Sequence, residues 1–224
     1  MGESSQPGVG TPDALFAADR MRMVDTQLRA RGISDERVLG AMSRVPRHEF
    51  TAEKYRDQAY EDHPLPIGEG QTISQPYMVA VMLEALSLTA TDKALEVGTG
   101  SGYATALLAE LAAQVFSLER HTRLADEARA LIARLGYTNV KIIAGDGAQG
   151  LPEAAPFDAI LVSAAAPEVP SALLTQLAEG GRMVVPVGVG DSQQLQLIRL
   201  QDGKPRTLLG DLCRFVPLVP GVEG

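Results

Sequence analysis

From Lys93 onward, short apolar segments alternate with segments whose apolar residues recur at helical spacing. The apolar segments predict strands at Ala94–Val97, Val115–Glu119, Val140–Ala144, Asp158–Val162 and Arg182–Val187. Helices are predicted between them at Tyr103–Leu111, Arg123–Leu135 and Pro170–Leu177. Strands that alternate with helices are joined by right-handed crossovers. The pattern therefore predicts an α/β fold with a doubly wound, mainly parallel sheet.

The alternation changes near the end of the chain. Apolar residues from Leu195 to Leu200 meet a turn at Asp202–Gly203, and a second β-rich stretch follows at Thr207–Val219. Two strand-like stretches joined by such a short turn are typical of an antiparallel hairpin. We expect this hairpin to close one edge of the sheet, which brings the predicted sheet to seven strands.

The first part of the chain has a helical pattern. Apolar residues at helical spacing predict two N-terminal helices, the first ending at Gly32 and the second beginning with Ser34 as its N-cap and stopping at Pro46. Residues 51–73 show little periodicity, which predicts a polar loop. A third helix is expected after Pro76.

These patterns predict a single domain over residues 13–224. Residues 13–73 would hold the N-terminal helices and a substrate loop, and residues 74–224 a Rossmann-like core. Residues 1–12 are rich in Gly, Ser and Pro, so we expect a disordered tail.

Composition narrows the possible partners. The net charge of −8 argues against a nucleic-acid partner, because such proteins usually present a basic face. No apolar run approaches the ~20 residues that span a bilayer, and the start lacks the features of a secretory signal. Cys213 is the single cysteine, which fits a reducing compartment. We expect a cytoplasmic protein that acts on neither nucleic acid nor membrane.

A glycine-rich turn follows the first predicted strand of the core. The strand carries Glu96 and runs into Gly98, Gly100 and Gly102, and a helical pattern begins directly afterwards. Glycine permits a sharp turn and a close approach of the backbone to a ligand, and the helix start offers free N–H groups. This arrangement indicates a nucleotide-type ligand, although several kinds of ligand use such a turn.

The ends of the next strands narrow the ligand further. Glu119 lies 19 positions after Gly100, where a carboxylate can accept hydrogen bonds from ribose hydroxyls. Asp146 follows the third strand and could accept from an adenine amino group, although a turn-forming role is an equal alternative. The chain has no P-loop, and no Arg or Lys was identified near the turn to meet a diphosphate. An adenosine cofactor without a bound phosphate fits best, and S-adenosylmethionine meets that description.

The motifs of the chain resemble those of the protein-L-isoaspartate O-methyltransferases, which belong to the class I methyltransferases. The resemblance extends from about Arg20 onward, and its most specific segments are GQTIS and FDAI…AAAP. One departure is Ser163, where Thr is more usual. The matching stretches are Pro64–Leu83, Leu95–Ala109, Val115–Arg120, Gly145–Gly147, Ala155–Pro170, Leu177–Gly188 and Arg214–Val219.

The resemblance implies an S-adenosylmethionine-dependent transfer of a methyl group to the free α-carboxylate of isoaspartyl residues in damaged proteins or peptides. It implies that Ser74 is the active-site hydroxyl, with Thr72 and Ile73 beside it, and that Val216, Pro217 and Leu218 help to hold the substrate backbone. The residues implied to bind the cofactor are Glu96, Gly98, Thr99, Gly100, Ser101, Glu119, Asp146 and Gly147.

The reaction implied by the family needs no general base, because an α-carboxyl with a pKa of about 3.3–3.7 is already an anion at neutral pH. This agrees with the scattered positions of His48, His63 and His121, which form neither a catalytic triad nor a metal cluster with Cys213. Ser74 lies next to a helix start, so a simple N-cap is the alternative to its role in the reaction.

Three other functions stay open at this stage. A methyltransferase of the same fold could act on another peptide or small-molecule carboxylate. A nicotinamide dehydrogenase could use the same turn and Glu119, but GxGxxG spacing would require glycine where Tyr103 stands. The third is an adenosine-binding module without catalytic activity. We expect a monomer.

Overall fold

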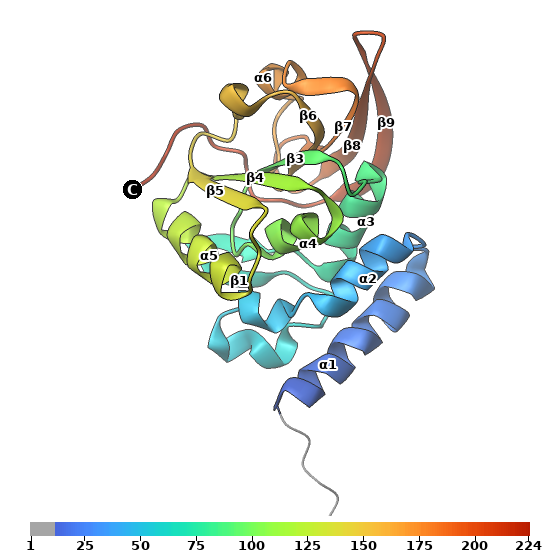
Figure 1. Cartoon of the computed structure of the whole chain (residues 1–224), viewed down its shortest axis with the longest axis vertical. Helices are drawn as coiled ribbons and strands as arrows, with labels where there is room; N and C mark the ends of the chain where they lie inside the picture. The colour runs from blue at the N-terminus through green and yellow to red at the C-terminus, as the bar shows by residue number, and fades with distance from the viewer. Residues whose placement is uncertain (1–11) are drawn as a thin grey trace, which may run out of the picture.

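The computed structural model describes residues 12–224 (Figure 1). The tail predicted over residues 1–12 lies outside the described residues except for Pro12, where the first helix begins. None of the helices in the described part is long and apolar enough to cross a membrane.

Two helices form the N-terminal part, as the pattern predicted. Helix α1 (Pro12–Met23) continues through η1 (Val24–Leu28) and η2 (Arg29–Arg31) to Gly32, whose φ of 98° is left-handed. Helix α2 spans Glu36–Arg44.

The predicted N-cap of α2 was wrong by one residue. The carboxylate of Asp35 accepts the backbone N–H groups of Arg37 (2.8 Å) and Val38 (3.4 Å), so Asp35 is the N-cap. Ser34 instead donates its backbone N–H to the Glu84 carboxylate at 2.7 Å. Ser34, which the local sequence favoured as the N-cap, therefore makes a tertiary contact with another helix instead.

The stretch predicted as a loop, residues 51–73, is more ordered than its pattern indicates. It holds the 3₁₀ helix η4 (Glu53–Gln58), which follows η3 (Arg47–Phe50), and then an antiparallel hairpin of β1 (Leu65–Gly68) and β2 (Gln71–Ile73). Both strands are short, and prolines lie before and within β1. The alternation of apolar and polar residues that indicates a strand was therefore not visible in the sequence.

A seven-stranded sheet forms the centre of the molecule, in the order β5-β4-β3-β6-β7-β8-β9. The first five strands of this order are parallel, and β8 and β9 run antiparallel to their neighbours, as predicted. The strands are β3 (Lys93–Val97), β4 (Gln114–Glu119), β5 (Val140–Ala144), β6 (Phe157–Val162), β7 (Leu177–Val187), β8 (Gln193–Gln201) and β9 (Lys204–Cys213).

The predicted turn at Asp202–Gly203 does connect β8 to β9. Both residues have positive φ (52° and 66°), as the mirror-image turns of two-residue hairpins require. The hairpin extends from one edge of the sheet in Figure 1, whereas the C terminus lies on the side of β5.

Helices cover the two faces of the sheet unequally. Helices α3 (Pro76–Leu86), α4 (Tyr103–Leu111) and α5 (Thr122–Arg134) pack with α2 on one face. The other face is covered by α6 and by the segment around η5 (Pro152–Ala154). The helix predicted at Pro170–Leu177 is shorter, because α6 spans only Ser171–Leu174 and Leu177 already pairs with Phe157 of β6.

The strand order changes direction between β3 and β6, and this position determines where a ligand can enter. The chain moves from β3 outward to β4 and β5, and then returns to the other side of β3 as β6. A crevice forms where successive connections leave in opposite directions, outside the carboxyl ends of the strands. Gly98 and Ser163 follow these two strand ends.

Candidate active site

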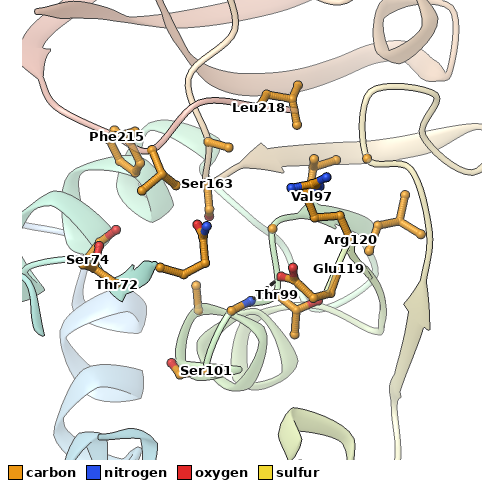
Figure 2. Close-up of a pocket in the computed structure, with 18 of the residues that line it drawn as sticks. Thr72, Ser74, Val97, Thr99, Ser101, Glu119, Arg120, Ser163, Phe215 and Leu218 are labelled. Atoms are coloured by element: carbon orange, nitrogen blue, oxygen red, sulfur yellow. Dashed lines mark hydrogen bonds between the residues drawn. The ribbon is translucent and has the colours of Figure 1, made fainter. Parts of the chain in front are cut away.

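A cavity of about 220 Å³ opens at the carboxyl ends of β3, β4 and β6. Its walls come from the glycine turn, the segment after β2, the end of β4 and the segment after β9. Figure 2 shows Thr72 and Ser74 on one side and Glu119 and Arg120 on the opposite side, with Ser163 between them. Residues far apart in the sequence thus meet where the strand order changes direction.

The glycine turn brings the backbone close to this cavity. Gly98 and Gly100 both line it and have φ angles of 93° and 52°, which L side chains rarely adopt. A Cβ on Gly100 would lie 3.2 Å from Cδ1 of Ile67 in β1. Thr99 and Ser101 line the same cavity. Four of the residues predicted to bind the cofactor therefore lie together.

Glu119 lines the cavity and also supports the turn. Its Oε2 accepts the backbone N–H of Gly100 at 2.8 Å, and its Oε1 accepts that of His121 at 3.0 Å. The side chain is only 5% exposed. Because each carboxylate oxygen can accept a second hydrogen bond, Glu119 can still receive two hydroxyl donors from the cavity.

Glu96 is buried beneath the turn and is not among the residues that line the cavity. Its Oε2 accepts hydrogen bonds from Thr105 Oγ1 (2.5 Å) and Ser117 Oγ (2.6 Å), and burial raises its pKa to about 7. Ser117 Oγ also lies 2.5 Å from Thr99 Oγ1. A chain of hydrogen bonds through the Ser117 and Thr99 hydroxyls therefore connects Glu96 to the cavity.

Asp146 also lies outside the lining of the cavity, although its neighbour Gly147 lines it. The Asp146 carboxylate accepts the backbone N–H of Ala148 at 2.9 Å. This is the turn-forming role that the sequence left as an alternative. A Cβ on Gly147 would lie 2.4 Å from Cγ1 of Val97, so only glycine fits this position without a shift.

A second, larger cavity of about 1320 Å³ adjoins the first. One wall includes Tyr77 and Met78 of α3, and the other includes the segments after β7 and β9. Both cavities share the same boundary residues, which are Thr72, Ser74, Ser163, Phe215, Val216, Pro217 and Leu218. The predicted substrate residues, apart from Ile73, lie on that boundary. Ile73 lines only the first cavity.

Ser74 occupies the boundary without serving as a helix cap. Helix α3 begins at Pro76, its N-cap is Gln75, and no side chain caps it. The backbone carbonyl of Ser74 accepts a hydrogen bond from Arg47 Nη2 at 2.8 Å. Among the described residues, the Ser74 hydroxyl has no hydrogen-bond partner, so it is available to a ligand.

The segment after β9, residues 214–224, crosses the cavity and is held at two points. Backbone hydrogen bonds join Ala165 to Val216 (2.8 Å) and to Leu218 (2.7 Å). Further along, Glu223 bonds to Arg120 through its N–H (2.7 Å) and its side chain (3.0 Å). The segment therefore forms part of the wall around a bound molecule.

Sequence reasoning missed several lining residues. Gln71 and Phe215 lie within the motifs of the resemblance, but nothing in their pattern assigned them to the cavity, whereas Ser163 was predicted at a strand end as a small residue that leaves room for a ligand. Arg120 and His121 directly follow Glu119, so their place at a strand end was the available signal. Arg120 corrects the statement that no Arg lies near the turn, but its charge is paired with Glu223.

The chemistry of these groups favours binding and orientation. Residues 12–224 contain no cluster of three His, Cys, Asp or Glu side chains that could hold a metal ion. His48, which is buried, lies 2.8 Å from the Tyr60 hydroxyl and outside both cavities. The first cavity instead offers hydroxyls, backbone groups and the Glu119 carboxylate, beside Arg120 and His121.

Comparison with known proteins places the chain among methyltransferases. The family model described as protein-L-isoaspartate(D-aspartate) O-methyltransferase matches residues 19–223. A protein-L-isoaspartate O-methyltransferase of Koribacter versatilis is 61% identical over 93% of this chain and 95% of its own length. One of Methanoculleus marisnigri is 55% identical over 90% of this chain and 91% of its own length.

Solved structures agree with this result. A putative protein-L-isoaspartate O-methyltransferase from Plasmodium falciparum, crystallised with S-adenosyl-L-homocysteine, superposes with a TM-score of 0.78. It is 31% identical and covers 89% of this chain and 98% of its own. A second structure described as a protein-L-isoaspartate O-methyltransferase gives a TM-score of 0.82 at 31% identity, over 90% of this chain and 67% of its own.

Proposed function

The chain belongs to the protein-L-isoaspartate(D-aspartate) O-methyltransferase family, and on that premise we propose that it methylates the free α-carboxylate of L-isoaspartyl residues in damaged proteins or peptides. The observation that carries the proposal is the boundary between the two cavities, where Ser74 and Thr72 face both. A donor in the first cavity and a peptide in the second would meet there.

S-adenosylmethionine is the methyl donor of this family, and it supplies a methyl group on a positively charged sulfonium. The first cavity suits an adenosine with an amino acid tail. Glu119 offers acceptor positions for ribose hydroxyls, and Gly98, Gly100 and Gly147 line the cavity with backbone alone. The buried Glu96 lies beneath the turn, and its second oxygen, Oε1, has no hydrogen-bond partner among the described residues.

The isoaspartyl α-carboxylate needs no base, because it is ionised at neutral pH. The chain must therefore bring this carboxylate to the boundary, orient it and exclude water. Enclosure favours the transfer, because water stabilises the separated opposite charges of the reactants more than their partly neutralised transition state. Holding the reactants in line supplies a further large part of the acceleration.

We assign the orientation of the carboxylate to the Ser74 hydroxyl, which can donate one hydrogen bond to a carboxylate oxygen. Thr72 and Ile73 form the adjoining wall, and Val216, Pro217 and Leu218 form the opposite wall for the substrate backbone. Contacts with the substrate backbone suit a flexible, damaged chain, since they do not select a particular sequence.

The methyl ester formed in this way carries a methoxy group, which leaves the carbonyl carbon more readily than an oxygen of the carboxylate does. Attack by the following backbone nitrogen on the ester carbonyl would expel methanol and close a succinimide. Hydrolysis of the succinimide returns part of the product as normal aspartate, which is the repair step that we infer.

We further infer a cytoplasmic monomer. Both cavities are lined by residues of a single chain. Cys213 is buried and burial raises its pKa to about 11, which suits an unreactive thiol in a reducing compartment.

A set of three matched peptides tests the proposed function. The peptides carry isoaspartate, normal aspartate or isoasparagine, which has an α-carboxamide, at one position, and transfer of a labelled methyl group is measured. We expect transfer to the isoaspartyl peptide alone. Equal labelling of the isoaspartyl and aspartyl peptides would indicate a methyltransferase for another carboxylate, and labelling of none would contradict the proposal.

A further inference from the structure

Arg47 carries a positive charge in the interior of the protein. Its side chain is 0% exposed, which is unusual for arginine, and it lies in η3 between α2 and the β1–β2 hairpin. Its hydrogen-bond acceptors are neutral backbone carbonyls, whereas the Asp62 carboxylate interacts with it electrostatically without a described hydrogen bond. Its Nε donates to the carbonyl of Ala59 at 2.7 Å and its Nη2 to the carbonyl of Ser74 at 2.8 Å.

The same guanidinium contacts the start of the cofactor helix. Its central carbon lies 4.8 Å from the centre of the Tyr103 ring. Tyr103 is the first residue of α4 and directly follows Gly102, the last glycine of the turn. Arg47 therefore joins the segment that carries Ser74 to the helix that begins at the cofactor turn.

A role in stability alone does not account for this residue. Removing a guanidinium from water is costly, and Nη1 of Arg47 has no hydrogen-bond partner among residues 12–224. Well-packed apolar side chains often replace buried charges without a loss of stability. The rigid fork of arginine does, however, fix two carbonyls at set positions, which a flexible apolar side chain cannot do.

We infer that Arg47 is a positioning residue, which holds the backbone at Ser74 so that its hydroxyl meets the acceptor carboxylate at the right place relative to the methyl donor. This inference rests on the proposed function. Arg47 lines neither cavity, so it acts only through Ser74 and Tyr103. Its loss should therefore affect turnover more than cofactor binding.

Arg182 provides a matched control. Its side chain is also largely buried, with 11% exposure, and it also donates to backbone carbonyls, at Leu86 (2.8 Å) and Ser87 (2.9 Å). It lines neither cavity. It differs from Arg47 in that its Nη2 also pairs with the Asp92 carboxylate at 2.6 Å. A variant of Arg182 therefore removes a buried guanidinium, and this ion pair with it, without removing a contact to Ser74.

The test compares Arg47→Met and Arg182→Met by thermal unfolding, by S-adenosylhomocysteine affinity and by single-turnover methylation of the isoaspartyl peptide. A displacement near 1 Å can reduce a rate by about 10²-fold. We expect a loss of that order in Arg47→Met, with cofactor affinity within about threefold of wild type. Arg182→Met should lose stability and keep its rate. If Arg47→Met does not fold, Arg47→Lys, which keeps the charge but not the fork, replaces it.

A double-mutant cycle with Ser74→Ala separates this inference from the proposed function. Ser74→Ala alone should lower the rate; if it does not, the assignment of Ser74 is wrong. If it does, Arg47→Met should cause little further loss in the Ser74→Ala background, because its effect passes through that hydroxyl. An equal loss in both backgrounds, an unchanged rate in Arg47→Met, or an equal loss in Arg182→Met would overturn the inference.

Discussion

At the scale of single residues, two glutamates at the ends of adjacent strands have different surroundings and different tasks. Glu119 accepts two backbone N–H groups and lines the cavity, where it remains available to hydroxyl donors. Glu96 is buried under the turn, and burial raises its pKa to about 7. The sequence predicted a cofactor role for both, and only the fold shows that Glu119 lines the cavity whereas Glu96 does not.

The raised pKa of Glu96 predicts a dependence of stability on pH. Between its usual value of 4.5 and about 7, the folded protein keeps a proton that the unfolded chain has lost. Stability contributed by this group is therefore present below pH 4.5 and decreases as pH rises to 7, by about 3 kcal/mol. Glu96→Gln should remove that decrease. Urea unfolding without cofactor should show the stability of the variant rising relative to that of the wild type as pH increases across this range. Parallel plots of unfolding free energy against pH would contradict the prediction.

At the scale of elements, the turns and connections determine the site. The sequence predicted the turn after β3 because its glycines are close together and follow an apolar strand. It did not predict the β1–β2 hairpin, which places Ile67 against Gly100. The hairpin depends on pairing between short strands that contain a proline, and such pairing is not visible in local periodicity.

Gly147 tests how closely the turn after β5 packs against the cofactor strand. A methyl group there would lie 2.4 Å from Cγ1 of Val97, which itself lines the cavity. Gly147→Ala should cost about 1–3 kcal/mol of stability and weaken S-adenosylhomocysteine binding. Gly210→Ala is the control, because its Cβ would make ordinary contact at 3.4 Å in β9. Adding Val97→Ala to Gly147→Ala should restore binding, and a failure to do so would argue against this clash.

The segment at residues 214–224 predicts an effect on cofactor exchange. Its Glu223 side chain pairs with Arg120 at 3.0 Å, and exposed pairs of this kind contribute about 0.2–1 kcal/mol. Glu223→Ala should therefore speed S-adenosylhomocysteine dissociation by up to about fivefold in stopped-flow displacement. Glu127→Ala, which breaks an exposed pair with Arg123 on α5, should leave the rate unchanged. Equal rates in the two variants would show that Glu223 does not restrain the segment.

At the scale of the whole molecule, the strand order brings the site together. Alternating apolar segments predicted the parallel strands and the C-terminal hairpin, and so the edge at which a ligand binds. The sequence was less informative about which side chains meet at that edge. Arg120 and Phe215 line the cavity, whereas Asp146 does not. These contacts depend on how residues 214–224 cross the cavity, and no local pattern records that path. The shared boundary at Ser74 is likewise a property of the complete fold.

We propose that this boundary delivers a methyl group to the isoaspartyl α-carboxylate and thereby starts repair. The most direct test follows an isoaspartyl peptide incubated with the protein and S-adenosylmethionine, with the products separated and sequenced by mass spectrometry. We expect a transient methyl ester on the α-carboxyl of the isoaspartyl residue, then a succinimide, and then a growing fraction of the normal aspartyl peptide. A methyl group on any other carboxyl, or an isoaspartyl peptide that stays unchanged while S-adenosylmethionine is present, would contradict it.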